Sequence, residues 1–125
     1  MKIAMTSITV TDPVKAHTFY TETLGFSSRM FIPEARLAIV VSPEEPDGTG
    51  LLLEPNDNPL SKTFQEGVYA QGLPVIVFGV PDVRQEYERL RGLGVTFQGE
   101  PTTAEWGTAA VFDDTCGNLI QIHQP

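Results

Sequence analysis

Three polar side chains have types and positions that could support chemistry at a small-molecule site. Glu54 follows the apolar run Leu51–Leu53, and Gln121 and His123 alternate with isoleucines near the end of the chain. An enclosed carboxylate is a candidate general base, while an amide and an imidazole can orient a ligand by hydrogen bonds. Two ordinary alternatives stay open: Glu54 as a solvated charge at a strand edge, and Gln121 as a strand residue bonded to neighbouring backbone.

The segments that must position these residues occur twice in the chain. Asp12 and Asp82 lie 70 positions apart (82 − 12), and Gly25 and Gly94 lie 69 apart (94 − 25). In both copies the Asp follows an alternating apolar segment and precedes a helical pattern, as an N-cap does. The Gly follows that pattern, where a left-handed stop is common. A period this long is not that of a solenoid, and it predicts two similar α+β modules.

Each module is predicted to have the order βαβββ, and the two together form a single domain. We expect module one over residues 1–57, a connector helix over 58–72 and module two over 73–125. Apolar spacing indicates that Phe64, Val68 and Tyr69 anchor the connector. The predicted strands are 3–10, 26–32, 36–42 and 49–55 in module one, and 74–80, 95–100, 107–112 and 118–123 in module two. The main helices are predicted to begin at Asp12 and, with Gln85 in a capping box, at Asp82.

Strand alternation assigns the side chains to two faces of each predicted sheet. One set of apolar residues packs under the main helices, and the residues between them face the other, concave way. The repeat pairs Met5 with Val75 on this concave face, and Glu54 with Gln121. The full set is Met5, Ser7, Thr9, Leu52 and Glu54 in module one, and Val75, Val77, Gly79, Leu119, Gln121 and His123 in module two.

The composition is that of a soluble globular protein and excludes several function classes. A chain of 125 residues with 41% apolar and 19% charged residues is expected to form one compact domain. The net charge of −8, without a basic cluster, argues against nucleic-acid binding. No apolar run is long enough for a membrane span or a secretory segment. The lone Cys116 cannot form an internal disulfide, which favours a cytoplasmic location, and it is interpreted as a turn residue rather than a nucleophile.

Two segments carry a resemblance to a known family: SITVTDPVKAHTFYTETLGF near the start and DDTCGNLIQIHQP at the end. Together with the paired βαβββ modules they resemble the vicinal oxygen chelate superfamily, the group of glyoxalases, bleomycin resistance proteins and extradiol dioxygenases. The resemblance covers essentially the whole chain. It implies an α+β fold whose two modules curl into a cup-shaped mixed sheet. Metal-dependent members hold one divalent ion there, with ligands from four strands at the positions occupied here by Met5, Glu54, Val75 and Gln121.

These four residues depart from the ligand set of the metal-dependent members. A thioether and an isopropyl group do not serve Mg, Mn or Fe, so Met5 and Val75 leave such an ion with too few ligands. We therefore expect no metal and no other cofactor. A displaced divalent site using Glu54, Gln121 and His123 is an alternative, although His123 is expected roughly 6–7 Å beyond Gln121 along the strand.

Without a metal, the cup is expected to be an apolar pocket with a few polar groups, which is typical of small-molecule sites. Trp106 is interpreted as a lid or stacking residue, and a core position is an equal alternative. Glu54 is the candidate catalytic residue. The candidate ligand-binding residues are Met5, Ser7, Glu54, Val75, Trp106, Gln121 and His123.

The favoured function is the binding or sequestering of a small apolar or aromatic molecule. The resemblance implies a homodimer, because in the drug-resistance branch the pocket commonly forms between subunits. One alternative is a lyase- or dioxygenase-like enzyme, with either a displaced metal or Glu54 as general base, and its support is the fold alone. The other is an interaction module without a ligand.

Overall fold

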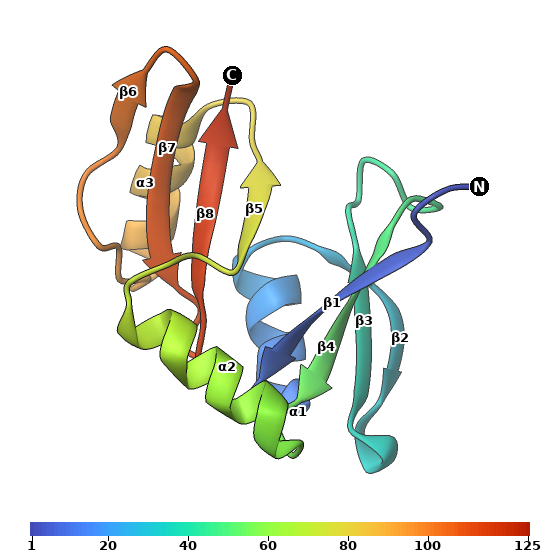
Figure 1. Ribbon diagram of the computed structural model, residues 1–125. Helices are drawn as coiled ribbons and strands as arrows, with labels where there is room; N and C mark the ends of the chain where they lie inside the picture. Colours follow the sequence, from blue (N-terminus) through green and yellow to red (C-terminus); the bar gives the residue numbers. More distant parts are fainter. The chain divides into compact units, whose positions relative to one another are not determined.

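The computed structural model describes residues 1–125, which divide into two compact units, residues 1–65 and 66–125. Each unit contains one four-stranded mixed sheet, so the α+β fold class is confirmed (Figure 1). Helix α2, Pro59–Ala70, begins in the first unit and ends in the second. No helix is both long enough and apolar enough to cross a membrane.

The first sheet has the strand order β1-β4-β3-β2. Strands β1 and β4 are parallel, whereas β3 is antiparallel to both β4 and β2. The long connection that this parallel pair requires runs through the helix after β1 and then through β2 and β3. The strands are β1 Met5–Val10, β2 Ser27–Ile32, β3 Leu37–Val41 and β4 Gly50–Pro55; a short 3-10 helix, η2, spans Pro33–Ala35.

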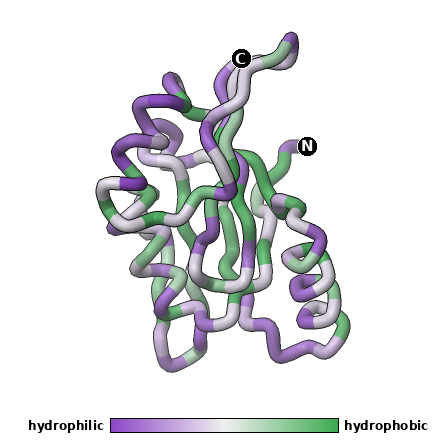
Figure 2. The backbone as a smooth tube through the Cα atoms, turned by 90° about the vertical axis from the view of Figure 1, so that its left-hand side faces the viewer, coloured by the Kyte–Doolittle hydropathy of each residue, from purple (hydrophilic) through white to green (hydrophobic).

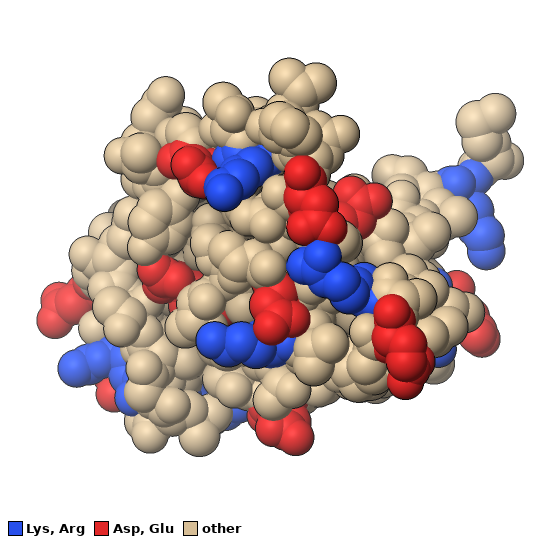
Figure 3. All heavy atoms as spheres, turned by 90° about the horizontal axis from the view of Figure 1, so that it is seen from below, with Lys and Arg blue, Asp and Glu red and all other residues tan.

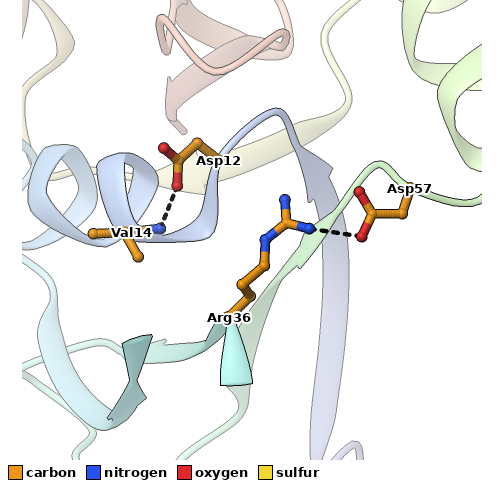
Figure 4. A network of polar contacts seen from close by, with 4 residues as sticks. All are labelled: Asp12, Val14, Arg36 and Asp57. Atoms are coloured by element: carbon orange, nitrogen blue, oxygen red, sulfur yellow. Dashed lines mark hydrogen bonds and ion pairs between the residues drawn. The ribbon is translucent and has the colours of Figure 1, made fainter. Parts of the chain in front are cut away.

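Helix α1, Pro13–Thr18, begins where the sequence predicted, with Asp12 as its N-cap. Asp12 Oδ1 accepts a hydrogen bond from the Val14 N–H at 2.9 Å (Figure 4). Such a cap contributes about 1 kcal/mol to stability. The chain continues as a π-helical segment, η1, Phe19–Thr23. Together they cover one face of the first sheet with fully buried Ala16 and Tyr20.

An ion pair joins η2 to the segment that follows β4. Arg36 Nη1 lies 2.7 Å from Asp57 Oδ2 (Figure 4). Arg36 adopts a left-handed backbone conformation with φ 51°. Both side chains are exposed, so the pair contributes at most about 1 kcal/mol.

The second sheet has the order β5-β8-β7-β6, with β5 and β8 parallel. Asp82 caps helix α3, Val83–Gly92, and its carboxylate accepts the Gln85 N–H at 3.1 Å. Phe97 packs edge-on against Tyr87 of α3, with ring centroids 4.7 Å apart, and lies beside Phe112 of β7. The strands are β5 Ile76–Gly79, β6 Thr102–Ala104, β7 Gly107–Asp113 and β8 Leu119–Gln124.

The alternation predicted for both sheets is confirmed at most positions, although Thr6, expected under the helix, is exposed, and Leu119, expected on the concave face, is buried. Under α1 the buried strand residues include Ile8, Val10, Leu51 and Leu53, and under α3 they include Phe112, Ile120 and Ile122. In Figure 2 the strand segments carry much of the hydrophobic green colouring, and many purple residues lie in loops and helices. The face of each sheet that no helix of its own unit covers is called its open face below.

The strand predicted over 95–100 is wrong. Phe97 makes only an isolated bridge to Phe112, and the sixth strand is instead β6, Thr102–Ala104. Gly99 and Pro101 interrupt the segment, because glycine weakens a strand and proline has no N–H for the ladder. Strand β6 forms after this break and pairs with β7.

The anchors predicted for the connector helix are also wrong in part. Phe64 is exposed, and its neighbour Gln65 is the buried residue of α2. The Gln65 amide donates to the Thr9 carbonyl at 2.6 Å and accepts from Asn56 Nδ2 at 3.0 Å. These two bonds satisfy partly buried polar groups, and this requirement outweighs the apolar spacing that favoured Phe64.

Candidate functional site

The open face of the first sheet carries the residues that alternation assigned to it. Ser7 lies opposite Leu52, and Thr9 lies opposite Glu54. Met5 lies opposite Gly50, four residues before Glu54 on the neighbouring strand. At about 3.3 Å per residue, Met5 and Glu54 are therefore separated by roughly 13 Å along the strands. Both side chains are exposed, so this face presents an apolar end and a carboxylate end.

The open face of the second sheet places Gln121 between two valines. Val77 of β5 is its partner on one side and Val111 of β7 on the other. Val75 precedes β5 on the same face, and its N–H donates to the Leu119 carbonyl at 2.9 Å. Its side chain thus lies one side-chain repeat before Val77. The amide of Gln121 is the polar group on an apolar strip.

His123 occupies the next position on this face, among very small neighbours. Its partners in the ladder are Gly79 of β5 and Ala109 of β7. A side chain added at Gly79 would meet no atom within 4 Å, so the surface beside the imidazole is open there. The face therefore changes from bulky valines around Gln121 to a low floor around His123.

A hollow of about 520 Å³ opens on the second unit beside this strip. This volume falls within the range of roughly 300–1,000 Å³ that is usual for small-molecule pockets. Ala109 and Val111 of β7, which share a face with Gln121, form its floor, and Ala110 between them also borders the hollow. The complete lining is Gln98, Gly99, Glu100, Thr102, Trp106, Ala109, Ala110, Val111 and Gln121.

Trp106 forms the aromatic part of the lining. Trp106 is 52% exposed. The alternative expected from the sequence, a position in the core, is therefore wrong. The Trp106 carbonyl accepts a hydrogen bond from His123 Nε2 at 2.7 Å. Because a carbonyl oxygen only accepts, Nε2 must carry a proton. The two rings lie at 35° with centroids 6.2 Å apart.

The lining carries one charged side chain, Glu100, and no Lys or Arg. The hollow therefore has no cation to balance an anionic ligand, and the chain as a whole has a net charge of −8. On the face shown in Figure 3, acidic and basic side chains are interspersed without an extended basic area. These features favour a neutral or cationic ligand over an anionic one.

The donor chemistry does not fit the divalent ion that the fold family implies. Met5 and Val75, which the resemblance places at two of the four ligand positions, offer a thioether and an isopropyl group, and neither serves a hard cation. No three His, Cys, Asp or Glu side chains lie together in an arrangement that could hold a metal ion.

The other histidine of the chain, His17, stacks on Phe31 with ring centroids 3.8 Å apart. Its Nε2 is hydrogen-bonded to Ser28 Oγ at 2.9 Å. Partial burial lowers the pKa of His17, and the nearby Glu22 carboxylate opposes this shift. The imidazole is thus part of a packed aromatic pair between α1 and β2.

Several residues of the hollow were not singled out from the sequence. Ala109 and Val111 could have been found from the alternation of β7, because they share the face of Gln121. Gln98 and Glu100 carried no such signal, since they lie in an irregular segment. Gln98 is placed by its N–H, which donates to the Val111 carbonyl at 2.8 Å.

The comparisons with known proteins agree on one family. The sequence model described as "Glyoxalase/Bleomycin resistance protein/Dioxygenase superfamily" matches residues 2–122. The protein YurT of Bacillus subtilis (strain 168) is 52% identical over 99% of both chains. The crystal structure of UcmS2 is 35% identical with a TM-score of 0.81, covering 98% of this chain and 97% of that one. The crystal structure of TnmS3, an antibiotic binding protein from Streptomyces sp. CB03234, is 28% identical with a TM-score of 0.78, covering 100% of this chain and 96% of that one.

Proposed function

The chain belongs to the glyoxalase/bleomycin resistance protein/dioxygenase superfamily, and we propose that it binds a small apolar or aromatic molecule in the hollow beside Trp106. The observation that carries this proposal is the combination of an exposed indole, an apolar floor and few polar groups in a hollow of about 520 Å³. A mostly apolar concavity with a few oriented polar groups is the usual form of a small-molecule site.

Each part of the lining has a distinct role in the proposed complex. A planar ligand stacks on the Trp106 indole, which contributes about 0.5–1.5 kcal/mol beyond the area that it buries. Ala109 leaves the floor low enough for a flat molecule to approach the sheet. The amides of Gln98 and Gln121 can donate to ligand oxygens or accept from ligand N–H and O–H groups.

The similarity to TnmS3 supports this function, because that protein is described as an antibiotic binding protein. Its identity of 28% and TM-score of 0.78 extend over the whole of this chain. We propose that this chain likewise holds its ligand without transforming it. In this proposal binding requires no metal, since the donors at the family's ligand positions do not fit one.

We propose further that the protein acts as a homodimer. The open face of the first sheet exposes Met5, Met30 and Ile32, and these are 49%, 44% and 41% exposed. A second copy of the chain would remove this apolar surface from water, which stabilises an association by about 25 cal/mol per Å². Light scattering after size exclusion tests this: a species of 13.7 kDa would contradict the dimer.

The binding test uses planar dyes of different charge. Neutral acridine and cationic proflavine are titrated against the protein, with anionic 8-anilinonaphthalene-1-sulfonate as the charge control, in the presence of EDTA. We expect the first two to bind and the anion to bind much more weakly. Trp106→Ala and Gln121→Leu should each weaken binding about tenfold, whereas Leu60→Ala, an exposed site outside the hollow, should leave it unchanged. Equal affinities in all four proteins would contradict the assignment of the site.

A further inference from the structure

We propose that His123 is a positioning residue that fixes Trp106 at the edge of the hollow through the hydrogen bond from Nε2 to the Trp106 carbonyl. This inference rests on the proposed function for its consequence, but the positioning itself is a property of the free protein. It gives His123 an indirect role, since the imidazole acts on a ligand only through Trp106.

The first support is the place of Trp106 in the chain. Ala104 of β6 pairs with Gly107 of β7, so Glu105 and Trp106 form the two-residue turn of a hairpin. Turn residues have few backbone partners and move more than the strands they join. The 2.7 Å bond from His123 gives this turn a fixed partner on β8.

The second support is the conformation of the next residue, Gly107. Its φ is +116°, a region that residues with a side chain rarely adopt. A Cβ at this position would come 2.1 Å from the Gln124 carbonyl oxygen and 3.0 Å from His123 Nε2. The absent side chain therefore lets the turn approach β8 closely enough for the imidazole to reach the Trp106 carbonyl.

The third support is that the base of the hairpin is held independently of the turn. Thr103 Oγ1 and Thr108 Oγ1 lie 2.9 Å apart across β6 and β7, and Arg84 Nη2 donates to Thr103 Oγ1 at 3.2 Å. These contacts hold the strands but none of them touches the indole. The bond from His123, in contrast, reaches the turn itself at the Trp106 carbonyl.

The consequence for binding is preorganisation. A ligand that must first immobilise a mobile side chain binds more weakly, and a side chain that is already fixed avoids this loss. Removal of the bond should therefore weaken ligand binding about 3- to 10-fold without removing any group that touches the ligand.

The experiment compares two amide substitutions that differ in reach. In His123→Gln the side-chain amide nitrogen lies at nearly the distance of Nε2 and can still donate to the Trp106 carbonyl. In His123→Asn the amide nitrogen lies closer to the backbone and does not reach it. Trp106 is the only tryptophan, so time-resolved fluorescence anisotropy reports the local motion of its indole alone. Proflavine affinity is measured on the same proteins, after circular dichroism confirms that each is folded.

We expect the Asn variant to show larger indole motion and about 3- to 10-fold weaker proflavine binding, and the Gln variant to resemble the native protein in both. Unchanged indole motion in the Asn variant would overturn the inference. Equal loosening in both variants would also overturn it, since the ring rather than its N–H would then be responsible. If the native protein binds no dye, the proposed function fails, and the indole motion still decides whether His123 positions Trp106.

Discussion

The hydroxyl of Tyr69, near the end of α2, donates a hydrogen bond to Asp113 Oδ2 of β7 at 2.5 Å. The other oxygen of the same carboxylate accepts the Thr115 N–H at 2.7 Å. One carboxylate thus ties α2 and the turn after β7 together within the second unit. Asp113 also raises the pKa of Tyr69, first by this bond and then by its charge.

This relationship predicts how Tyr69 titrates. Its pKa should lie above the ordinary value of 10.0, and Asp113→Asn should bring it back toward that value. Because the pKa of Tyr69 is raised in the folded state, its hydrogen bond to Asp113 stabilises the fold fully at pH values below the pKa of the unfolded chain. This stabilisation is lost as the pH rises through the pKa of the folded protein. NMR titration of the assigned Tyr69 ring carbons measures the shift. A native value at or below 10.0 would contradict the assigned bond.

The stacked pair of His17 and Phe31 makes the opposite prediction. Burial lowers the pKa of His17 from 6.5, so the unfolded chain binds the proton more readily. The stability that this difference contributes is present above pH 6.5 and decreases as pH falls through the folded pKa. Phe31→Ala should expose the ring and raise the pKa of His17 toward 6.5. NMR titration of the His17 ring protons measures this pKa. A pKa of His17 that is higher in the native protein than in Phe31→Ala would contradict the prediction.

The buried Gln65 predicts a large effect from an isosteric change. Gln65→Leu keeps the volume but leaves the Thr9 carbonyl without the 2.6 Å donor. The substitution removes both hydrogen bonds of the Gln65 amide, at about 0.5–1.5 kcal/mol each, so urea unfolding should show a loss of about 1–3 kcal/mol. The neighbouring substitution Phe64→Ala is the control, since Phe64 is 64% exposed and should change stability by less than about 0.5 kcal/mol. A larger loss of stability in Phe64→Ala than in Gln65→Leu would contradict this prediction and would support Phe64 as the anchor of α2.

Two glycines of the second sheet, Gly107 and Gly79, are expected to tolerate an added side chain very differently. Gly107→Ala places a methyl group 2.1 Å from the Gln124 carbonyl oxygen at a φ of +116°, and strain of this kind costs about 1–3 kcal/mol. Gly79→Ala adds a methyl group with no atom within 4 Å and should leave the free energy of unfolding nearly unchanged. Thermal unfolding of both variants provides the measurement. Equal stabilities would show that the turn before β7 adapts freely.

The features that could be predicted from the sequence are those that depend on local periodicity, namely helix starts and strand faces. The caps at Asp12 and Asp82 and the open faces around Ser7 and Gln121 are correct, because a pleated strand must alternate and a helix must begin at a residue that caps it. The strand predicted around Phe97 was wrong, because pairing of this segment with β7 depends on contacts distant in the sequence. Gly99 and Pro101 interrupt that pairing. The hollow itself was not predicted in detail for the same reason. Gln98 and Glu100 reach it through irregular backbone, which has no period to read.

The central claim, that the hollow beside Trp106 is the ligand site, is tested most directly by NMR mapping of proflavine binding. Titration of the dye into isotope-labelled protein follows every backbone amide and the single indole N–H at once. We predict that the shifts are largest at Trp106, Ala109, Val111 and Gln121, the residues that line the hollow. Shifts confined to other residues, such as Tyr69 and Thr115 at a separate hollow of about 450 Å³, would contradict the claim.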